Sequence, residues 1–253
     1  FPLILLEALA PLGEAYLKVL REAFSAGWID VYENQGKRSG AYAWGAFGTH
    51  PYVLLNYKES LEGLYTLAHE LGHAMHSYLS SGNQPYIYAE YTIFLAEIAS
   101  TVNEVLLTRY LLRTLEGEER LTVLNYYLEQ FRTTLFRQTM FAEFEREAHQ
   151  LVAKGKTLTM ESLNKIYLEL NRAYYGPEVV LDEQLAFEWA RIPHFYTPFY
   201  VYKYATGFSS AVALADIIEE EGAAGYLQFL KSGSSDYSLA ILKRAGVDLA
   251  VSG

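Results

Sequence analysis

The chain has 253 residues, a formal net charge of −10 and 51% hydrophobic residues, which is enough apolar material for a sizeable core. The acidic balance, without a cluster of Lys or Arg, argues against nucleic-acid and anionic-membrane partners. Because cysteine is absent, a transition-metal site would have to be built from His and carboxylate ligands. No apolar run approaches the roughly 20 residues that span a bilayer. We therefore expect a soluble, cytoplasmic protein.

Most of the predicted elements are helices. Residues 2–26 carry apolar side chains at helical spacing and are interrupted only at positions 11–13. Residues 34–57 are rich in turn-forming and aromatic residues and end in the best strand candidate, PYVLLNY, which leads into a helix. Further helices are predicted over 59–80, 87–115, 118–153, 159–174, 184–192, 199–221 and 223–231. The pattern predicts a mainly α protein with a small β-sheet next to one of its helices.

One helix carries a pattern typical of metal sites. His69, Glu70 and His73 form the motif HELGH. On an α-helix, residues four apart lie on one face a turn apart, so both imidazoles can reach one ion about 2.1 Å away. Glu70 then lies beside that ion, where a general base is needed for hydrolysis. The motif predicts a zinc site, against the alternative of paired surface histidines.

His76 shares the same helix face and is a candidate third ligand. About 10.5 Å of axial rise separates it from His69, which is too far for both rings to meet one small ion. We expect His76 either to support the ligands from outside the metal site or to be a buried, hydrogen-bonded histidine. The third ligand must therefore come from another segment.

The next predicted helix carries Glu90, Glu97 and Glu104, seven residues apart and therefore on roughly one face. Three carboxylates on an otherwise apolar helix are costly to bury unless a cation or another partner is present. Glu97 is central, with Ser100 and Asn103 nearby for hydrogen bonds, and is the candidate ligand, while Glu90 remains an alternative. Glu104 is expected to orient a histidine ring. The alternative is a solvated acidic face.

These residues carry a resemblance to a known family. HELGHAMHS, followed by FLAEIASTVNE around Glu97, resembles the M3 family of zinc metallopeptidases, and within it the oligoendopeptidase F group. The resemblance covers essentially the whole chain and implies a multi-helix, zincin-type catalytic domain over residues 1–253, without the N-terminal lobe and extreme C-terminus of longer relatives. It implies one Zn²⁺ per chain, held by His69, His73 and Glu97, with Glu70 as general base.

A second segment, HFYTPFYVYKYATG at 194–207, is aromatic. Taken alone, it is typical of a packed helix. The resemblance implies that His194 and Tyr202 stabilise the negative charge that develops on the substrate carbonyl oxygen. It leaves Tyr200 and Tyr196 as further candidate donors.

The strand segment GTHPYVLLNY, with Gly48 and Tyr52, is hypothesised to bind substrate by strand addition; alternatively it only packs against the motif helix. We expect hydrolysis of internal bonds in short peptides by a metal-activated water. The alternatives are a zinc- and peptide-binding protein with little or no turnover, and a zinc exopeptidase.

Overall fold

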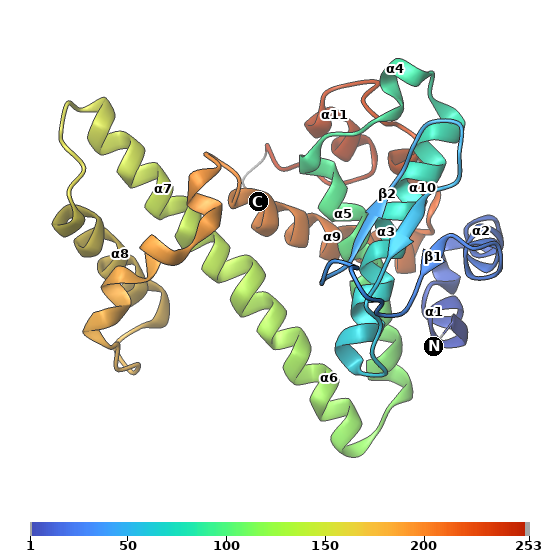
Figure 1. Ribbon diagram of the computed structural model, residues 1–253, viewed down its shortest axis with the longest axis horizontal. Helices are drawn as coiled ribbons and strands as arrows, with labels where there is room; N and C mark the ends of the chain where they lie inside the picture. Colours follow the sequence, from blue (N-terminus) through green and yellow to red (C-terminus); the bar gives the residue numbers. More distant parts are fainter. Residues whose placement is uncertain (1, 251–253) are drawn as a thin grey trace. The chain divides into compact units, whose positions relative to one another are not determined.

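The computed structural model describes residues 2–250 and divides into two compact units (Figure 1). The first unit comprises Phe1–Asn125 and Gly207–Gly253, and the second comprises Tyr126–Thr206. The mainly α fold with a small sheet is confirmed. Within residues 2–250, no helix is both long and apolar enough to cross a membrane.

The first unit begins with the broken helix expected from the sequence. Helix α1 (Pro2–Ala8), the 3-10 turn η1 (Ala10–Leu12) and helix α2 (Glu14–Ser25) follow one another directly. Gly13 makes the break, because its φ of 85° lies in the left-handed region that favours glycine. Of the predicted apolar positions, Leu9, Leu17 and Leu20 are buried, whereas Leu3 is exposed.

A three-stranded sheet lies next to the motif helix (Figure 1). Strand β3 (Tyr52–Leu54) is central, with β1 (Ile29–Asp30) parallel on one side and β2 (Tyr42–Trp44) antiparallel on the other. The sheet order β1-β3-β2 therefore leaves β2 at an edge.

The motif helix α3 (Leu61–Asn83) packs along α5 (Ile93–Thr114), and these two helices form the centre of the first unit (Figure 1). They approach so closely that a Cβ atom on Gly72 would lie 2.5 Å from the Cα of Ser100 and 2.7 Å from the carbonyl oxygen of Ala99. Asn103 of α5 fixes the crossing by donating to the carbonyl of Ala68 at 3.1 Å. Gly72 is therefore required for this helix–helix distance.

Short helices complete the first unit: α4 (Tyr86–Ala89), α10 (Ala224–Leu230) and α11 (Ser238–Arg244). Helix α9 (Tyr202–Glu221) joins the units and begins later than predicted. Helix α11 was not predicted, because seven residues are too short to show a clear period.

The second unit is mainly helical, and a helix that begins in the first unit leads into it. Helix α6 (Gly117–Gln130) passes through a π-helical turn, η2 (Phe131–Phe136), into α7 (Arg137–Ala153). Helix α8 (Met160–Tyr175) and two 3-10 segments, η3 (Glu183–Arg191) and η4 (Pro193–Tyr196), follow. The helix predicted over 184–192 is present as the 3-10 helix η3. The core of the second unit comprises Met140, Phe141, Phe144, Tyr167, Ile192 and Val201.

We expect Gly72→Ala to lower the free energy of unfolding by about 1–3 kcal/mol, because the added methyl group meets backbone rather than a movable side chain. Gly82→Ala is the matched control on the same helix, since nothing lies within 4 Å of its added Cβ. Chemical denaturation of both variants measures the difference. Equal stabilities would show that the helices do not meet at Gly72.

Candidate functional site

Helix α3 places its two motif histidines side by side. Ser60 directly precedes the helix, and its hydroxyl accepts the amide proton of Gly63 and caps the first turn. One turn separates His69 from His73, and their Nε2 atoms lie 3.2 Å apart with the rings nearly perpendicular. Two imidazole nitrogens therefore converge on one point.

Glu97 of α5 completes a three-residue cluster. Its Oε2 atom lies 3.5 Å from the Nε2 of His69 and 3.8 Å from that of His73. Ligand atoms bound tetrahedrally at about 2.1 Å are separated by about 3.4 Å. The donor atoms of His69, His73 and Glu97 therefore fit a single metal ion with one coordination position left open. Glu90, the sequence alternative, is exposed and lies before α5 begins.

Glu104 lies about two turns further along α5, on the opposite side of His69. Its Oε1 atom is 2.6 Å from the Nδ1 of His69 and leaves Nε2 for the cluster. Burial lowers the pKa of His69, but the hydrogen bond and charge of Glu104, with the charges of Glu97 and Glu70, raise it to about 9. Burial, and the neighbouring His69, lower the pKa of His73 to about 3.

Glu70 is buried beside the cluster. Burial raises the pKa of its carboxyl group, which is partly offset by His69 and by a hydrogen bond from the backbone amide of Ala43. Its Oε2 atom has no hydrogen-bond partner among residues 2–250. A buried carboxylate oxygen normally has a partner, so this atom suits a water molecule at the open position. The chain's donor set and Glu70 together fit a hydrolytic metal centre.

His76 is fully buried, and the expectation that it is hydrogen-bonded was wrong for residues 2–250. Its ring stacks on Tyr91 at 3.5 Å, and burial, followed by the charge of His73, lowers its pKa to about 3. Tyr91 in turn donates to the carbonyl of His73 at 3.4 Å and contacts the hydroxyl of Ser77. His76 therefore supports the motif helix by packing rather than by a hydrogen bond.

The strand segment does not offer a free edge. Strand β3, which contains Tyr52, is paired on both sides, so strand addition to it is excluded. Gly48 lies in the turn before it with a φ of 84°. The amide of Val53 donates to Trp28 on the β1 side, so the opposite residue, Ala43, directs its own amide and carbonyl away from β3. The available edge is that of β2.

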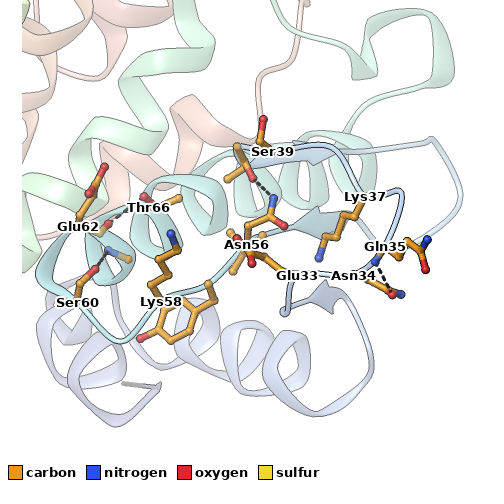
Figure 2. Close-up of a pocket in the computed structure, with 15 residues that line it drawn as sticks. Glu33, Asn34, Gln35, Lys37, Ser39, Asn56, Lys58, Ser60, Glu62 and Thr66 are labelled. Atoms are coloured by element: carbon orange, nitrogen blue, oxygen red, sulfur yellow. Dashed lines mark hydrogen bonds between the residues drawn. The ribbon is translucent and has the colours of Figure 1, made fainter.

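A cavity of about 720 Å³ opens at the N-terminal end of α3 (Figure 2). Ala41, directly before β2, and Thr66, one helical turn before Glu70, both line it. Lys37, which also lines the cavity, holds the loop after β1 in place, because its ammonium group donates to the carbonyls of Asp30 and Tyr32. The cavity thus adjoins both the edge strand and the motif helix.

The aromatic segment lies in the second unit. The exposed His194 stacks on Tyr200 with ring centroids 5.8 Å apart, and its Nε2 lies 3.3 Å from the hydroxyl of Tyr204. Tyr202 begins α9, and Tyr196 is 80% exposed. The structure groups His194 with Tyr200 and places Tyr196 and Tyr202 on the surface.

Sequence reasoning missed three residues around these sites. Ala43 contacts Glu70 through its backbone, which side-chain chemistry cannot reveal. Tyr91 lay in a predicted helix as one of many tyrosines. Tyr204 is four residues after Tyr200, and that helical spacing to a candidate donor was the one available signal.

We expect Zn²⁺ binding to the metal-free protein to strengthen as the pH rises from 6.5 to 9, because His69 is protonated below about pH 9 and must lose that proton to bind. Glu104→Gln removes the main interaction that raises this pKa. It should release less than the roughly one proton that the parent releases at pH 7.5, and weaken affinity about 10- to 100-fold.

Isothermal titration calorimetry in two buffers of different ionisation enthalpy measures both quantities. Glu90→Gln, at an exposed position, is the control. Affinity that does not change between pH 6.5 and 9 would contradict the assignment of Glu104.

The similarity to known proteins covers both units of the chain. The chain matches the description "Peptidase family M3" over residues 6–252. It is 52% identical over 249 residues to oligopeptidase PepF of Bacillus subtilis, covering 97% of this chain and 37% of that protein. It is 49% identical to group B oligopeptidase PepB of Streptococcus agalactiae, covering 96% of this chain and 41% of that protein.

The fold is also similar to that of a solved relative. The crystal structure of oligoendopeptidase-F from Enterococcus faecium matches with a TM-score of 0.71 and 42% identity, over 97% of this chain and 38% of that one. The chain thus spans about two-fifths of the length of these relatives. The family resemblance seen in the motif is confirmed: the chain belongs to peptidase family M3.

Proposed function

We propose that the protein is a zinc-dependent oligopeptidase that hydrolyses internal bonds of short peptides. The observation that carries the proposal is the convergence of His69, His73 and Glu97 at near-tetrahedral separations. Two imidazoles and one carboxylate with an open position are typical of catalytic zinc. Membership of family M3, and relatives named oligopeptidases, support the same conclusion.

The residues of the chain divide the chemistry between them. Bound zinc would lower the pKa of a coordinated water toward neutrality and polarise the substrate carbonyl. Glu70 takes a proton from the attacking water and transfers it to the leaving amine. Glu104 holds His69 in the tautomer that presents Nε2. No covalent bond between protein and substrate is needed.

The aromatic segment is proposed to stabilise the charge on the former carbonyl oxygen. His194, Tyr200 and Tyr202 offer N–H and O–H donors, which are the groups that this charge requires. Family likeness supports the assignment, and Tyr196 is retained as a substrate-contacting residue. The contact between His194 and Tyr204 holds the imidazole in place within this group.

Substrate binding is proposed to use β2. The backbone carbonyl of Ala43 is turned away from the sheet, so an extended peptide can donate a main-chain hydrogen bond to it. Such pairing gives affinity without strict sequence choice. The adjoining cavity offers space for substrate side chains, whereas Gly48 and Tyr52 contribute by shaping the turn and the central strand that support β2.

We expect Glu70→Gln to lower kcat on an internally quenched peptide of about ten residues by on the order of 10²- to 10⁴-fold while zinc content is unchanged. The variant keeps the shape of the side chain and loses the base. Glu90→Gln should retain parental turnover, and a chelator should abolish it.

Fluorescence release and metal analysis on the same samples provide the measurement. Zinc bound by the parent protein without cleavage would favour a binding protein over an enzyme. Cleavage restricted to terminal residues would favour an exopeptidase.

A further inference from the structure

We propose that Glu145 is a positioning residue that fixes the aromatic segment of the second unit through the backbone of Phe199. The inference rests on the proposed role of His194 and the tyrosines. It begins from an anomaly: Phe199 has a φ of 57° and is the one non-glycine residue among residues 2–250 with a positive φ. A bulky residue holds this backbone conformation only where its surroundings impose it.

Two residues of α7 impose the conformation. The backbone amide of Phe199 donates to Oε1 of Glu145 at 2.6 Å, and the side chain of Glu145 belongs to a residue that is only 7% exposed. The ring of His149, one turn further along α7, lies 4.6 Å from the ring of Phe199. A short hydrogen bond to a carboxylate with little access to water is stronger than a neutral one. Glu145 and His149 therefore hold both the backbone and the side chain of Phe199.

Lys203, near the start of α9, holds the backbone carbonyl of Phe199. Lys203 donates from Nζ to the carbonyl of Phe199 at 3.0 Å, and the same ammonium group lies 5.0 Å and 5.3 Å from the rings of Tyr200 and Tyr202. Lys203 thus links the backbone of Phe199 to the rings of Tyr200 and Tyr202. Displacing Phe199 would displace the stacked pair of Tyr200 and His194.

Helix α7 is a rigid support for this contact. Phe141 and Phe144 pack with Tyr167 and Phe195 in the core of the second unit. Glu145 is not part of that core cluster and lines an adjoining cavity of about 580 Å³ together with Phe144 and Phe195. The carboxylate of Glu145 therefore binds the backbone of Phe199 and does not pack in the core. Removing this carboxylate should release the segment around Phe199 without disrupting the core.

The test compares Glu145→Ala, Glu145→Gln and a control, Glu147→Ala, in the zinc-loaded protein. Glu147 is on the same helix, is 42% exposed and pairs only with Arg146 among the ion pairs of residues 2–250. Hydrogen–deuterium exchange reports on the 196–202 segment, and steady-state kinetics separate kcat from KM.

In Glu145→Ala, we expect amide exchange in the segment to accelerate about tenfold, from loss of a charged hydrogen bond. We expect kcat to fall about 10- to 100-fold with KM within about twofold, as for a misplaced catalytic group. Glu145→Gln, which keeps an acceptor oxygen, should restore most of kcat. Glu147→Ala should match the parent.

Unchanged exchange, or unchanged kcat, in Glu145→Ala would overturn the inference. So would parallel losses of zinc, KM and melting temperature, which indicate a merely structural role. Tyr200→Phe and Tyr202→Phe separate this result from the proposed function. If both retain parental kcat while Glu145→Ala does not, the assignment of oxyanion donors fails and the positioning role stands.

Discussion

The close crossing of α3 and α5 at Gly72 is the constraint on which the candidate metal site depends. Neither helix alone carries enough ligands: α3 supplies two imidazoles, and α5 supplies the carboxylate. Only at this separation does Glu97 come within 4 Å of both rings. The crossing is held by buried polar contacts, since Asn103 donates to the backbone of α3 and accepts from Tyr16 of α2. The site is thus a product of helix packing, and its geometry is built into the core rather than into a loop.

The same packing creates an electrostatic problem that a metal ion resolves. Two histidines and three carboxylates share a largely buried region, where unpaired charge is costly. The opposite pKa shifts of His69 and His73 show how the metal-free protein accommodates this, because one ring takes a proton and the other stays neutral. A bound divalent cation would replace that proton and balance the carboxylates. Burial of Glu70 beside the same point then supplies a base whose charge is sensitive to its surroundings.

The sequence was sufficient where the chemistry is local. His69, Glu70 and His73 lie within one turn and a half of helix, so their geometry followed from helical spacing alone. The stripe of glutamates predicted a partner helix, but the preference for Glu97 over Glu90 relied mainly on family likeness. Prediction failed where pairing is long-range: strand order put the candidate substrate strand in the middle of the sheet, and β2 at the edge. It also failed where the backbone acts, as at Ala43 and Phe199, because residue type carries no signal of an outward-turned amide or a left-handed φ.

The first unit carries the candidate metal site, and the second carries the proposed oxyanion donors, next to the positive φ of Phe199. The central claim, that α3 and α5 together form a zinc site with an open position, is tested most directly by X-ray absorption spectroscopy of the zinc-loaded protein. The account predicts four nitrogen or oxygen ligands at about 2.0–2.1 Å, with scattering from two imidazoles. In Glu97→Gln, the contribution of the carboxylate oxygen should be lost. Three imidazoles, or a spectrum unchanged by Glu97→Gln, would contradict it.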